Sequence, residues 1–279
     1  MFQEYTKIYD EFNNYFIDYF EPTNKFNEAL NYAIKEGKRI RPIILLETYK
    51  MLSGKEISDR ELEFAIALEF IHNYSLIHDD LPAMDDDDFR RDRPTLHKKY
   101  REDIAILAGD GLLNKTYELM LKQTILSNNY ETTNQALKAS EAIASNAGIK
   151  GMIGGQVIDV LEISNSKEDI LDMYKGKTCG LIIAATVAGA YLAGSGDSVI
   201  SDMNKLGLVI GLAFQLQDDL LDIDEDKKID KLTYISFTDE SQTRNKIDEM
   251  TNEAIEILSK YKDNKFMTQL LNYLVKRRY

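Results

Sequence analysis

The sequence predicts an all-α fold, organised as one large helical domain over residues 1–279. All four prolines lie in the first third of the chain, at Pro22, Pro42, Pro82 and Pro94. Proline breaks helix interiors, so the proline-free remainder favours long, uninterrupted helices. Alternating β-branched runs bounded by turn dipeptides, which would indicate strands, are scarce. No linker rich in Gly, Ser or Pro interrupts the chain.

Several helices can be placed from local signals. Residues 58–61, Ser-Asp-Arg-Glu, have the spacing of a capping box and precede an apolar helix over residues 62–78. A second apolar helix is expected over residues 206–222. Residues 248–275 are amphipathic and charged, which predicts a peripheral helix or helix pair. Residues 179–193 are apolar, rich in small residues and short for a membrane span, so they are expected to form a buried helix.

The composition restricts the class of function. The chain is 44% hydrophobic and 29% charged, with a formal net charge of −13. A chain this acidic, without a basic footprint, is not expected to bind nucleic acid. The single cysteine, Cys179, excludes an internal disulfide and a cysteine-rich zinc site, and it fits the reducing cytoplasm. The first residues lack the charged and apolar regions of a targeting segment.

Two of the expected helices carry a polar stripe on an otherwise apolar surface. The first helix places His72, Ser75 and Asp79 at i, i+3 and i+7, which puts them on one face. The second ends in Asp218 and Asp222, one helical turn apart. Because unpaired buried carboxylates are costly, a cation is expected beside them. The stripes therefore predict a charged cavity inside the helical bundle.

Two acidic segments supply candidate metal ligands. They cover residues 79–88 and residues 218–222. Neighbouring carboxylates can share Mg²⁺, which completes its octahedron with water and phosphate oxygens. On an ideal helix Asp79 and Asp85 would point about 120° apart, so a kink or bulge near Pro82 is expected to bring them together. For residues 86–88 a solvated acidic run remains an equal interpretation.

Basic residues beside the acidic segments indicate a phosphorylated ligand. Lys38, Arg39 and Arg41 form a short cationic segment, and Arg90 and Arg91 follow the first acidic segment. Arginine binds phosphate oxygens through a planar fork, and lysine supplies a point charge. The chain has no P-loop and no Rossmann fingerprint. A small organic diphosphate is therefore favoured over a nucleotide.

In their order along the chain, these motifs resemble those of the trans-type isoprenyl diphosphate synthases, the polyprenyl synthetase family, and most of all its bacterial farnesyl diphosphate synthases. The resemblance covers residues 37–234. It rests on Gly-Lys-Arg-Ile-Arg-Pro at 37–42 and on segments 72–80, 90–91, 107–110, 155–159, 177–178 and 214–219. Either aspartate motif alone is moderately specific, whereas both together with the basic motifs are a strong signal.

The resemblance implies an isoprenoid synthase-like bundle around a central active-site cavity. The implied reaction is the head-to-tail condensation of isopentenyl diphosphate with dimethylallyl or geranyl diphosphate to farnesyl diphosphate. About three Mg²⁺ ions per site, with Mn²⁺ as an alternative, would assist ionisation. The metal ligands would be Asp79, Asp80, Asp85, Asp218, Asp219 and Asp222. A cytoplasmic homodimer is also implied, for which the small-residue helix near residues 184–193 could serve as the interface.

The resemblance also assigns roles in substrate binding. Isopentenyl diphosphate would be held by Lys38, Arg41, His72 and Arg91. The allylic diphosphate would be held by Arg90, Lys177 and a later lysine that matches Lys231. The main-chain carbonyl of Lys177, with Thr178 and Gln215, would face the developing allylic cation. Gln156 would line the site.

Tyr74 is the candidate determinant of product length. It precedes Asp79 by five residues, about 7.5 Å along the same helix, so its ring could close the apolar pocket from below. The enlarged spacing between the aspartates of the first motif resembles bacterial C15 synthases. Farnesyl diphosphate is the expected product, and geranylgeranyl diphosphate is the alternative. Core packing alone remains another interpretation of Tyr74.

The sequence departs from the family pattern in two places. Relatives usually follow the arginine pair with glycine, where this chain has Asp92. After Asp222, relatives carry a longer loop with a Gly-Lys pair, whereas residues 223–234 are short and lack glycine. Lys227 or Lys228 could replace the missing lysine, or nothing could. The departure after Asp222 therefore bears on the third metal ion and on closure of the site at this end.

Two other functions fit part of the pattern. A class I terpene cyclase would also use Mg²⁺ and a prenyl diphosphate, but it would not need Lys38, Arg41 and Arg91 for a second substrate. A non-catalytic partner subunit should have lost aspartates from at least one motif, and this chain retains both sets. Release of hydrocarbon from one substrate alone would identify the cyclase. Activity of the purified chain by itself would exclude the partner subunit.

Overall fold

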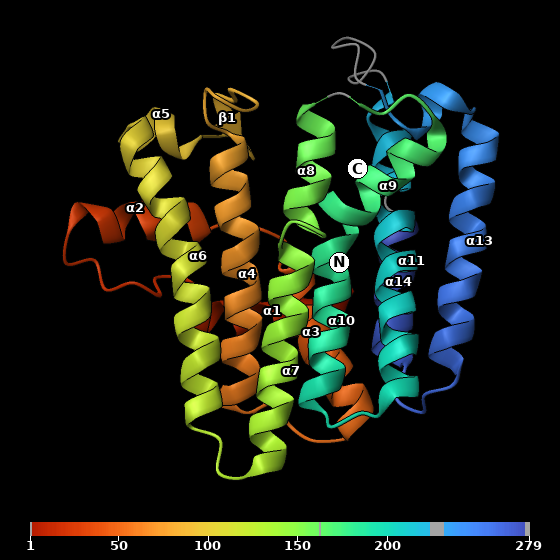
Figure 1. Ribbon diagram of the computed structural model, residues 1–279, viewed down its shortest axis with the longest axis horizontal. Coiled ribbons are helices and arrows are strands. Elements are labelled where there is room, and N and C mark those ends of the chain that lie inside the picture. Colours follow the sequence, from red (N-terminus) through yellow and green to blue (C-terminus); the bar gives the residue numbers. More distant parts are fainter. Residues whose placement is uncertain (1, 162, 224–231, 277–279) are drawn as a thin grey trace. The chain divides into compact units, whose positions relative to one another are not determined.

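The protein is almost entirely helical, as expected from the sequence. The computed structural model describes residues 2–161, 163–223 and 232–276, and these residues form helices and one short two-stranded ribbon (Figure 1). In chain order the elements are α1 (Gln3–Phe16), α2 (Lys25–Ile34), α3 (Ile40–Ser53), α4 (Asp59–Asp79), β1 (Phe89–Arg90), β2 (Arg93–Pro94), α5 (Leu96–Tyr100), α6 (Glu102–Ile125), α7 (Tyr130–Ala147), α8 (Met152–Val160), α9 (Lys167–Lys177), α10 (Cys179–Leu192), α11 (Asp197–Leu221), the 3₁₀ turn η1 (Tyr234–Phe237), α13 (Glu240–Ser259) and α14 (Lys265–Lys276).

The chain divides into two compact units. The N-terminal unit comprises Gln3–Ile43 and Ser58–Thr133, and the C-terminal unit comprises Met1–Phe2, Ile44–Ile57 and Asn134–Tyr279. Each unit contains one of the two acidic segments, at the end of α4 and at the end of α11.

The N-terminal unit is built on the packing of α4 against α6, with α2 and α5 beside them. At the start of α4 the expected capping box is present, and the main-chain N–H of Ser58 donates to the carboxylate of Glu61 at 3.0 Å. Aromatic rings fill the core around Phe70, with ring centroids of Phe16 and Phe20 at 5.4 and 5.6 Å. Such offset and tilted pairs add to the stability gained from burial. A rigid α4 can therefore present its C-terminal aspartates at a fixed position.

In the C-terminal unit α10 is the buried helix that the sequence predicts. It packs against α11, where two glycines allow close approach: a Cβ on Gly207 would lie 2.6 Å from the Cα of Ile183, and one on Gly211 would lie 2.7 Å from Sγ of Cys179. Because Ala184, Ala188 and Ala190 are fully buried inside this unit, they are not exposed for contact with a second copy. The suggested dimer interface on this helix is therefore wrong.

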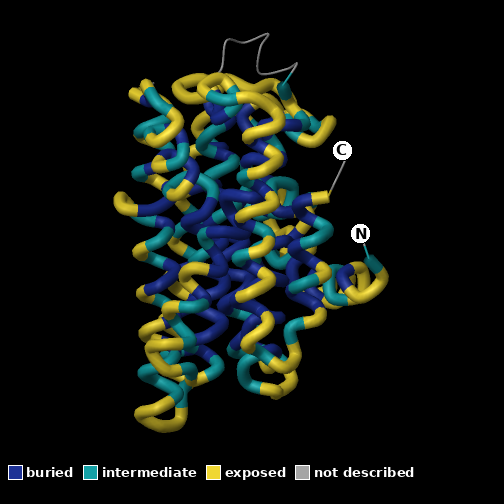
Figure 2. The backbone as a smooth tube through the Cα atoms, turned by 90° about the vertical axis from the view of Figure 1, so that its right-hand side faces the viewer, coloured by how far each residue is buried: buried dark blue, intermediate teal, exposed yellow. Residues whose placement is uncertain are grey.

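Helices α13 and α14 confirm the predicted pair near the C-terminus, and both pack against α11. The connections are largely exposed, and helices such as α6 and α13 alternate buried and exposed residues along their length (Figure 2). By length and composition α11 could cross a membrane, and within the described part of the chain it alone passes that test. Half of its most apolar window is buried inside the unit, as is usual for a core helix.

Candidate active site

The first acidic segment begins where α4 ends. Pro82 has no N–H to donate, so the helix cannot continue through it, and α4 ends at Asp79 with the N–H of Asp80 bonded to the carbonyl of Leu76 at 3.1 Å. The chain then folds back, and the N–H of Asp85 donates to the carbonyl of Asp79 at 2.8 Å. This turn brings the backbones of the two outer aspartates together, by ending the helix rather than by bending it.

The middle aspartate of this segment is held by an arginine. Asp80 is buried, and its Oδ1 lies 2.5 Å from Nη2 and 2.6 Å from Nε of Arg90. Burial raises the pKa of the Asp80 carboxyl, and the pair with Arg90 opposes that shift. Burial alone would lower the pKa of Arg90, but its hydrogen bond to Asp80 and the nearby carboxylates raise it overall. The pair fixes a cation directly beside the first acidic segment.

Arg90 belongs to the short ribbon, which the sequence did not predict. β1 and β2 pair antiparallel, Phe89 with Pro94 and Arg90 with Arg93. The two residues between the strands, Arg91 and Asp92, have φ of +54° and +61°. A two-residue hairpin turn with positive φ at both positions favours glycine or a short polar residue such as aspartate. Asp92 can therefore occupy the place where relatives usually have glycine without changing the turn.

Lys38, Arg41 and His72 lie in the same unit. Lys38 is exposed, and its main-chain carbonyl accepts a hydrogen bond from the hydroxyl of Tyr5. Nη1 of Arg41 lies 3.3 Å from Nε2 of His72. Burial and the charges of the nearby arginines, Arg41 first, lower the pKa of His72 well below its usual value. Arginine can only donate, so Nε2 accepts and the neutral ring carries its proton on Nδ1.

Arg39, between the predicted ligands of the cationic segment, is 1% exposed and has a positive φ of +53°. Its guanidinium lies 3.0 Å from Oε1 of the buried Glu69 and donates to the carbonyl oxygens of Ile34 at 2.6 Å and Glu36 at 3.0 Å. It also stacks on the ring of Phe16. These contacts fix the backbone that carries the cationic segment, a role that the sequence did not reveal.

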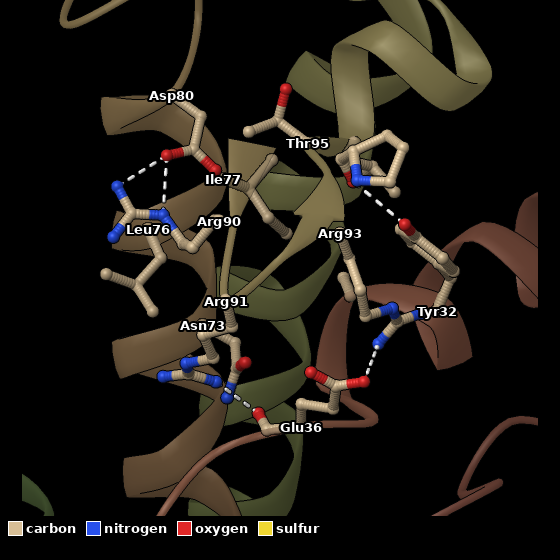
Figure 3. Close-up of a pocket in the computed structure, with 13 residues that line it drawn as sticks. Tyr32, Glu36, Asn73, Leu76, Ile77, Asp80, Arg90, Arg91, Arg93 and Thr95 are labelled. Carbon is tan, nitrogen blue, oxygen red and sulfur yellow. Dashed lines mark hydrogen bonds and ion pairs between the residues drawn. The ribbon is translucent and has the colours of Figure 1, made fainter. Parts of the chain in front are cut away.

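A cavity in the N-terminal unit brings several of these cations together (Figure 3). It is lined by Tyr32, Ala33, Glu36, Asn73, Leu76, Ile77, Asp80, Arg90, Arg91, Arg93, Pro94, Thr95 and Leu96. Figure 3 shows Asp80 and Arg90 pointing toward each other, and Arg93 directed at Glu36, 3.0 Å away. Arg91 donates to the main-chain carbonyl of Glu36. Among the described residues, Arg90 and Arg91 line this cavity, whereas Lys38, Arg41 and His72 do not.

In the C-terminal unit, Lys177 ends α9 and forms an ion pair with Asp159 of α8. The two helices touch through glycines, since a Cβ on Gly155 would lie 2.0 Å from the main-chain nitrogen of Lys177. The close crossing explains why glycine is required at position 155, and it fixes the position of Lys177 relative to α8. Beside it, neither side-chain amide atom of the buried Gln156 head group meets a hydrogen-bond partner among the described residues. Buried polar atoms left unpaired are costly and are often ligand-binding atoms.

Thr178, Gln215 and Asp219 form a connected network. The hydroxyl of Thr178 donates to Oε1 of Gln215 at 2.7 Å, and Nε2 of Gln215 donates to Oδ1 of Asp219 at 3.2 Å. Oδ2 of Asp219 accepts from the hydroxyl of Tyr174 at 2.8 Å and from the N–H of Tyr234 at 3.3 Å. Asp219 is only 3% exposed. Tyr174 is a site residue that sequence reasoning missed, because its partner is 45 positions away.

The outer aspartates of the second segment lie on one face. The N–H of Asp222 donates to the carbonyl of Asp218 at 2.9 Å, so the helical turn between them is intact. Asp218 is half-buried and Asp222 is exposed at the end of α11. Oxygen donors at this spacing fit a hard divalent cation. No three His, Cys, Asp or Glu side chains converge on a ready-made metal site anywhere in residues 2–161, 163–223 and 232–276.

Two further predictions have different outcomes. Lys231, together with Lys227 and Lys228, lies outside the described residues. Tyr74 is buried on α4, 6% exposed, with its ring centroid 5.8 Å from that of His78. Burial raises the pKa of Tyr74 to about 12, so its hydroxyl is neutral at physiological pH. Its role as a floor of the pocket stays a prediction.

The class of protein follows from the fold. Over 98% of this chain and 97% of the other, the structure matches an FPP/GFPP synthase from Zymomonas mobilis with a TM-score of 0.87 at 29% identity. A geranyltransferase from Legionella pneumophila matches with a TM-score of 0.85 at 29% identity, over 99% of this chain and 98% of the other. The fold is therefore that of the isoprenyl synthases.

The family follows from the sequence comparisons. The polyprenyl synthetase family model matches residues 23–274, and the chain belongs to that family. A farnesyl diphosphate synthase of Micrococcus luteus is 34% identical over 93% of this chain and 91% of the relative. Geranylgeranyl pyrophosphate synthase 7 of Arabidopsis thaliana is also 34% identical, over 91% of this chain and 76% of the relative. The resemblance inferred from the motifs is confirmed.

Proposed function

We propose that the protein is a prenyltransferase that adds isopentenyl diphosphate to dimethylallyl and then geranyl diphosphate, with farnesyl diphosphate as the main product. The observation that carries the proposal is the pairing of Thr178 with Gln215 in a polyprenyl synthetase whose sequence retains both aspartate motifs. We further propose that both units act as one domain. The family model spans 23–274 and so includes residues of both.

The allylic diphosphate is proposed to bind Arg90 and Lys177, with Lys231 as a third contact. Each of the first two is already held by a carboxylate, Arg90 by Asp80 and Lys177 by Asp159. Such pairs keep a cation in place before substrate arrives, which lowers the reorganisation needed on binding. Arginine and lysine then stabilise the charge that builds on the leaving diphosphate.

Metal binding is proposed at the aspartates of both segments: Asp79, Asp80, Asp85, Asp218, Asp219 and Asp222. The folded-back turn at Asp85 and the intact helical turn at Asp222 present oxygen donors of the type that Mg²⁺ prefers. Bound Mg²⁺, about three ions with Mn²⁺ as an alternative, would neutralise the leaving group.

Isopentenyl diphosphate is proposed to bind Lys38, Arg41, His72 and Arg91. The neutral His72 ring can still donate from Nδ1, so it can hydrogen-bond a phosphate oxygen without carrying charge. Oxygen atoms of Thr178, Gln215 and the Lys177 carbonyl face the allylic cation, while Gln156 lines the site. The allylic C–O bond breaks to give that cation and diphosphate, the isopentenyl double bond attacks the cation, and the added isopentenyl unit then loses a proton to the departing diphosphate. Apolar helix walls exclude the water that would otherwise quench the cation.

A cytoplasmic homodimer is also part of the proposal. Leu107, Tyr117, Leu121 and Ile125 are exposed large apolar residues within about 80° of one another around α6, calculated from 100° per residue. Exposed apolar faces of this kind mark interaction surfaces. Light scattering should give twice the chain mass of 32.0 kDa. A mass equal to one chain would overturn the dimer.

The test of function is product analysis. Purified protein with Mg²⁺, isopentenyl diphosphate and dimethylallyl diphosphate should give mainly C15 diphosphate. C20 product would favour the geranylgeranyl alternative, which similarity to the Arabidopsis synthase also supports. No condensation by folded, metal-supplied protein would overturn the proposal.

Tyr74 provides the test of product length. Tyr74→Ala should shift the distribution to longer chains, because it opens the apolar wall beneath the first aspartates. Tyr74→Phe keeps the ring and should leave the C15 product unchanged. Equal product distributions from the two variants would contradict the floor role.

A further inference from the structure

A chain of hydrogen bonds connects Tyr174 to Thr178 within the C-terminal unit. From α9, the Tyr174 hydroxyl donates to Asp219 of α11 at 2.8 Å. Asp219 accepts from Nε2 of Gln215 at 3.2 Å, and Oε1 of Gln215 accepts from the Thr178 hydroxyl at 2.7 Å. Every donor in this chain points toward Asp219.

This direction follows from the chemistry of Asp219. An ionised carboxylate can only accept, so it selects the amide nitrogen of Gln215 and turns the amide oxygen toward Thr178. That oxygen in turn takes the hydroxyl proton of Thr178, which leaves the lone pairs of the Thr178 oxygen directed away from Gln215. The opposite amide orientation would place an N–H, rather than an oxygen, against Thr178. Asp219 therefore decides which partial charge the site presents.

Asp219 is nearly inaccessible to water, 3% exposed, and so is Tyr174 at 4%. A carboxylate this buried needs hydrogen-bond donors to offset the loss of water and to hold its orientation. The Tyr174 phenol supplies one on Oδ2, the oxygen that also accepts from the N–H of Tyr234 at 3.3 Å. Because Oδ1 then faces Gln215, the phenol helps to set the rotation of the carboxylate.

We propose that Tyr174 is a positioning residue: through Asp219 it fixes the Gln215 amide, so that oxygen dipoles of Gln215 and Thr178 meet the allylic cation. The inference rests on the proposed prenyltransferase function and extends it to a residue outside the aspartate and basic motifs. Tyr174 itself does not touch the reacting atoms. It acts on the charge presented to the cation rather than on the grip on diphosphate.

Two ligands separate these effects in binding experiments with Mg²⁺ and without isopentenyl diphosphate. One is an allylic diphosphate analogue with a protonated amine in place of the cationic carbon. The other is an allylic thiolodiphosphate, in which sulfur replaces the oxygen between the chain and the diphosphate and the hydrocarbon chain carries no charge. Tyr174→Phe should weaken the ammonium analogue about tenfold, as expected for loss of one outer partner of a site residue. The thiolodiphosphate should be weakened clearly less than the ammonium analogue, since its chain carries no positive charge for these oxygens to meet and its proposed contacts with Arg90 and Lys177 do not involve Asp219.

Tyr261→Phe is the matched control. In the same unit, the Tyr261 hydroxyl donates to Asp202 at 2.9 Å, so the variant also removes a phenol from an aspartate. It should leave both affinities unchanged. A second check is Gln215→Leu: in that background Tyr174→Phe should add no further loss, because the residue through which it acts is gone.

The outcomes distinguish the inference from the proposed function. If Tyr174→Phe weakens both analogues equally, or weakens neither, the positioning role is overturned while the function stands. A full additional loss in the Gln215→Leu background would also overturn it. If wild-type protein binds neither analogue and makes no prenyl diphosphate, the proposed function fails first.

Discussion

The two acidic segments have the same burial pattern but different surroundings. In each, the first aspartate is half-buried, the second is buried and the last is exposed: Asp79, Asp80 and Asp85 at the end of α4, and Asp218, Asp219 and Asp222 at the end of α11. The buried Asp80 is matched by a full positive charge on Arg90. The contacts of the buried Asp219 include a phenol, an amide and a main-chain N–H.

The difference teaches how one motif can serve two purposes. At α4, the charges of Asp80 and Arg90 offset each other. The first segment can therefore hold the β1–β2 ribbon, which carries Arg90, beside the other aspartates. At α11, the Tyr174 phenol and the Tyr234 N–H bind one carboxylate oxygen of Asp219, and the other oxygen orients the Gln215 amide and, through it, Thr178. Both segments are proposed to bind metal, and the second also orients the side chains of Gln215 and Thr178.

The largest expected effect tests what the two segments share. Asp79→Asn and Asp218→Asn each remove a proposed metal-binding charge, and each should lower kcat about 10³-fold, because transition-state charge on the diphosphate loses its stabilisation. Steady-state rates over a Mg²⁺ titration are the measurement, and saturating metal should not restore the rate. Chelation of metal from wild type should have the same result.

Asp88→Asn is the control for these variants. Asp88 belongs to the same acidic run, but it is exposed and pairs with the exposed Lys98 at 2.6 Å. Exposed pairs contribute little, so activity should stay at the wild-type level. A strong loss in Asp88→Asn, or full activity in Asp79→Asn alone, would break the parallel between the segments.

The second prediction concerns the buried Arg39–Glu69 ion pair of the N-terminal unit and its effect on folding stability. Arg39→Met should destabilise the protein by about 3–5 kcal/mol, because it leaves the Glu69 carboxylate buried without its cation. Adding Glu69→Gln should recover part of that loss, since a neutral amide is less costly to bury. Denaturant unfolding of the single and double variants measures both. A double variant that is less stable than Arg39→Met would contradict an uncompensated charge as the cause.

The sequence predicted the fold and the chemical classes of the site residues better than their partners. Helix ends at Ser58 and Asp79 follow from capping and proline rules, which act between close neighbours. The contacts of Arg39 with Glu69 and of Tyr174 with Asp219 join residues 30 and 45 positions apart, and no local pattern encodes them. The ribbon was missed because its strands are only two residues long.

The smallest expected effect concerns the arginines around His72 in the N-terminal unit. The pKa of His72 is lowered in the folded protein by burial first and then by Arg41, Arg91, Arg39 and Arg90. Below about pH 6.5 the unfolded chain therefore binds a proton that the folded protein does not. Folding stability then decreases as the pH is lowered, by at most about 1.4 kcal/mol per pH unit. His72→Gln should remove this part of the acid sensitivity.

Thermal unfolding of wild type and His72→Gln from pH 7.5 to 5.5 measures that difference. The difference in stability between wild type and His72→Gln should be constant above about pH 6.5 and should change in favour of the variant below it, because protonation of residue 72 stabilises the unfolded state of wild type alone. His78→Gln is the control, since His78 lies on the same helix and contacts the carbonyl of Ile106 rather than arginines. Parallel curves for His72→Gln over the whole range would mean that the arginine cluster does not hold the ring neutral. The electrostatic contrast between the two acidic segments would then be confined to the Asp80–Arg90 pair.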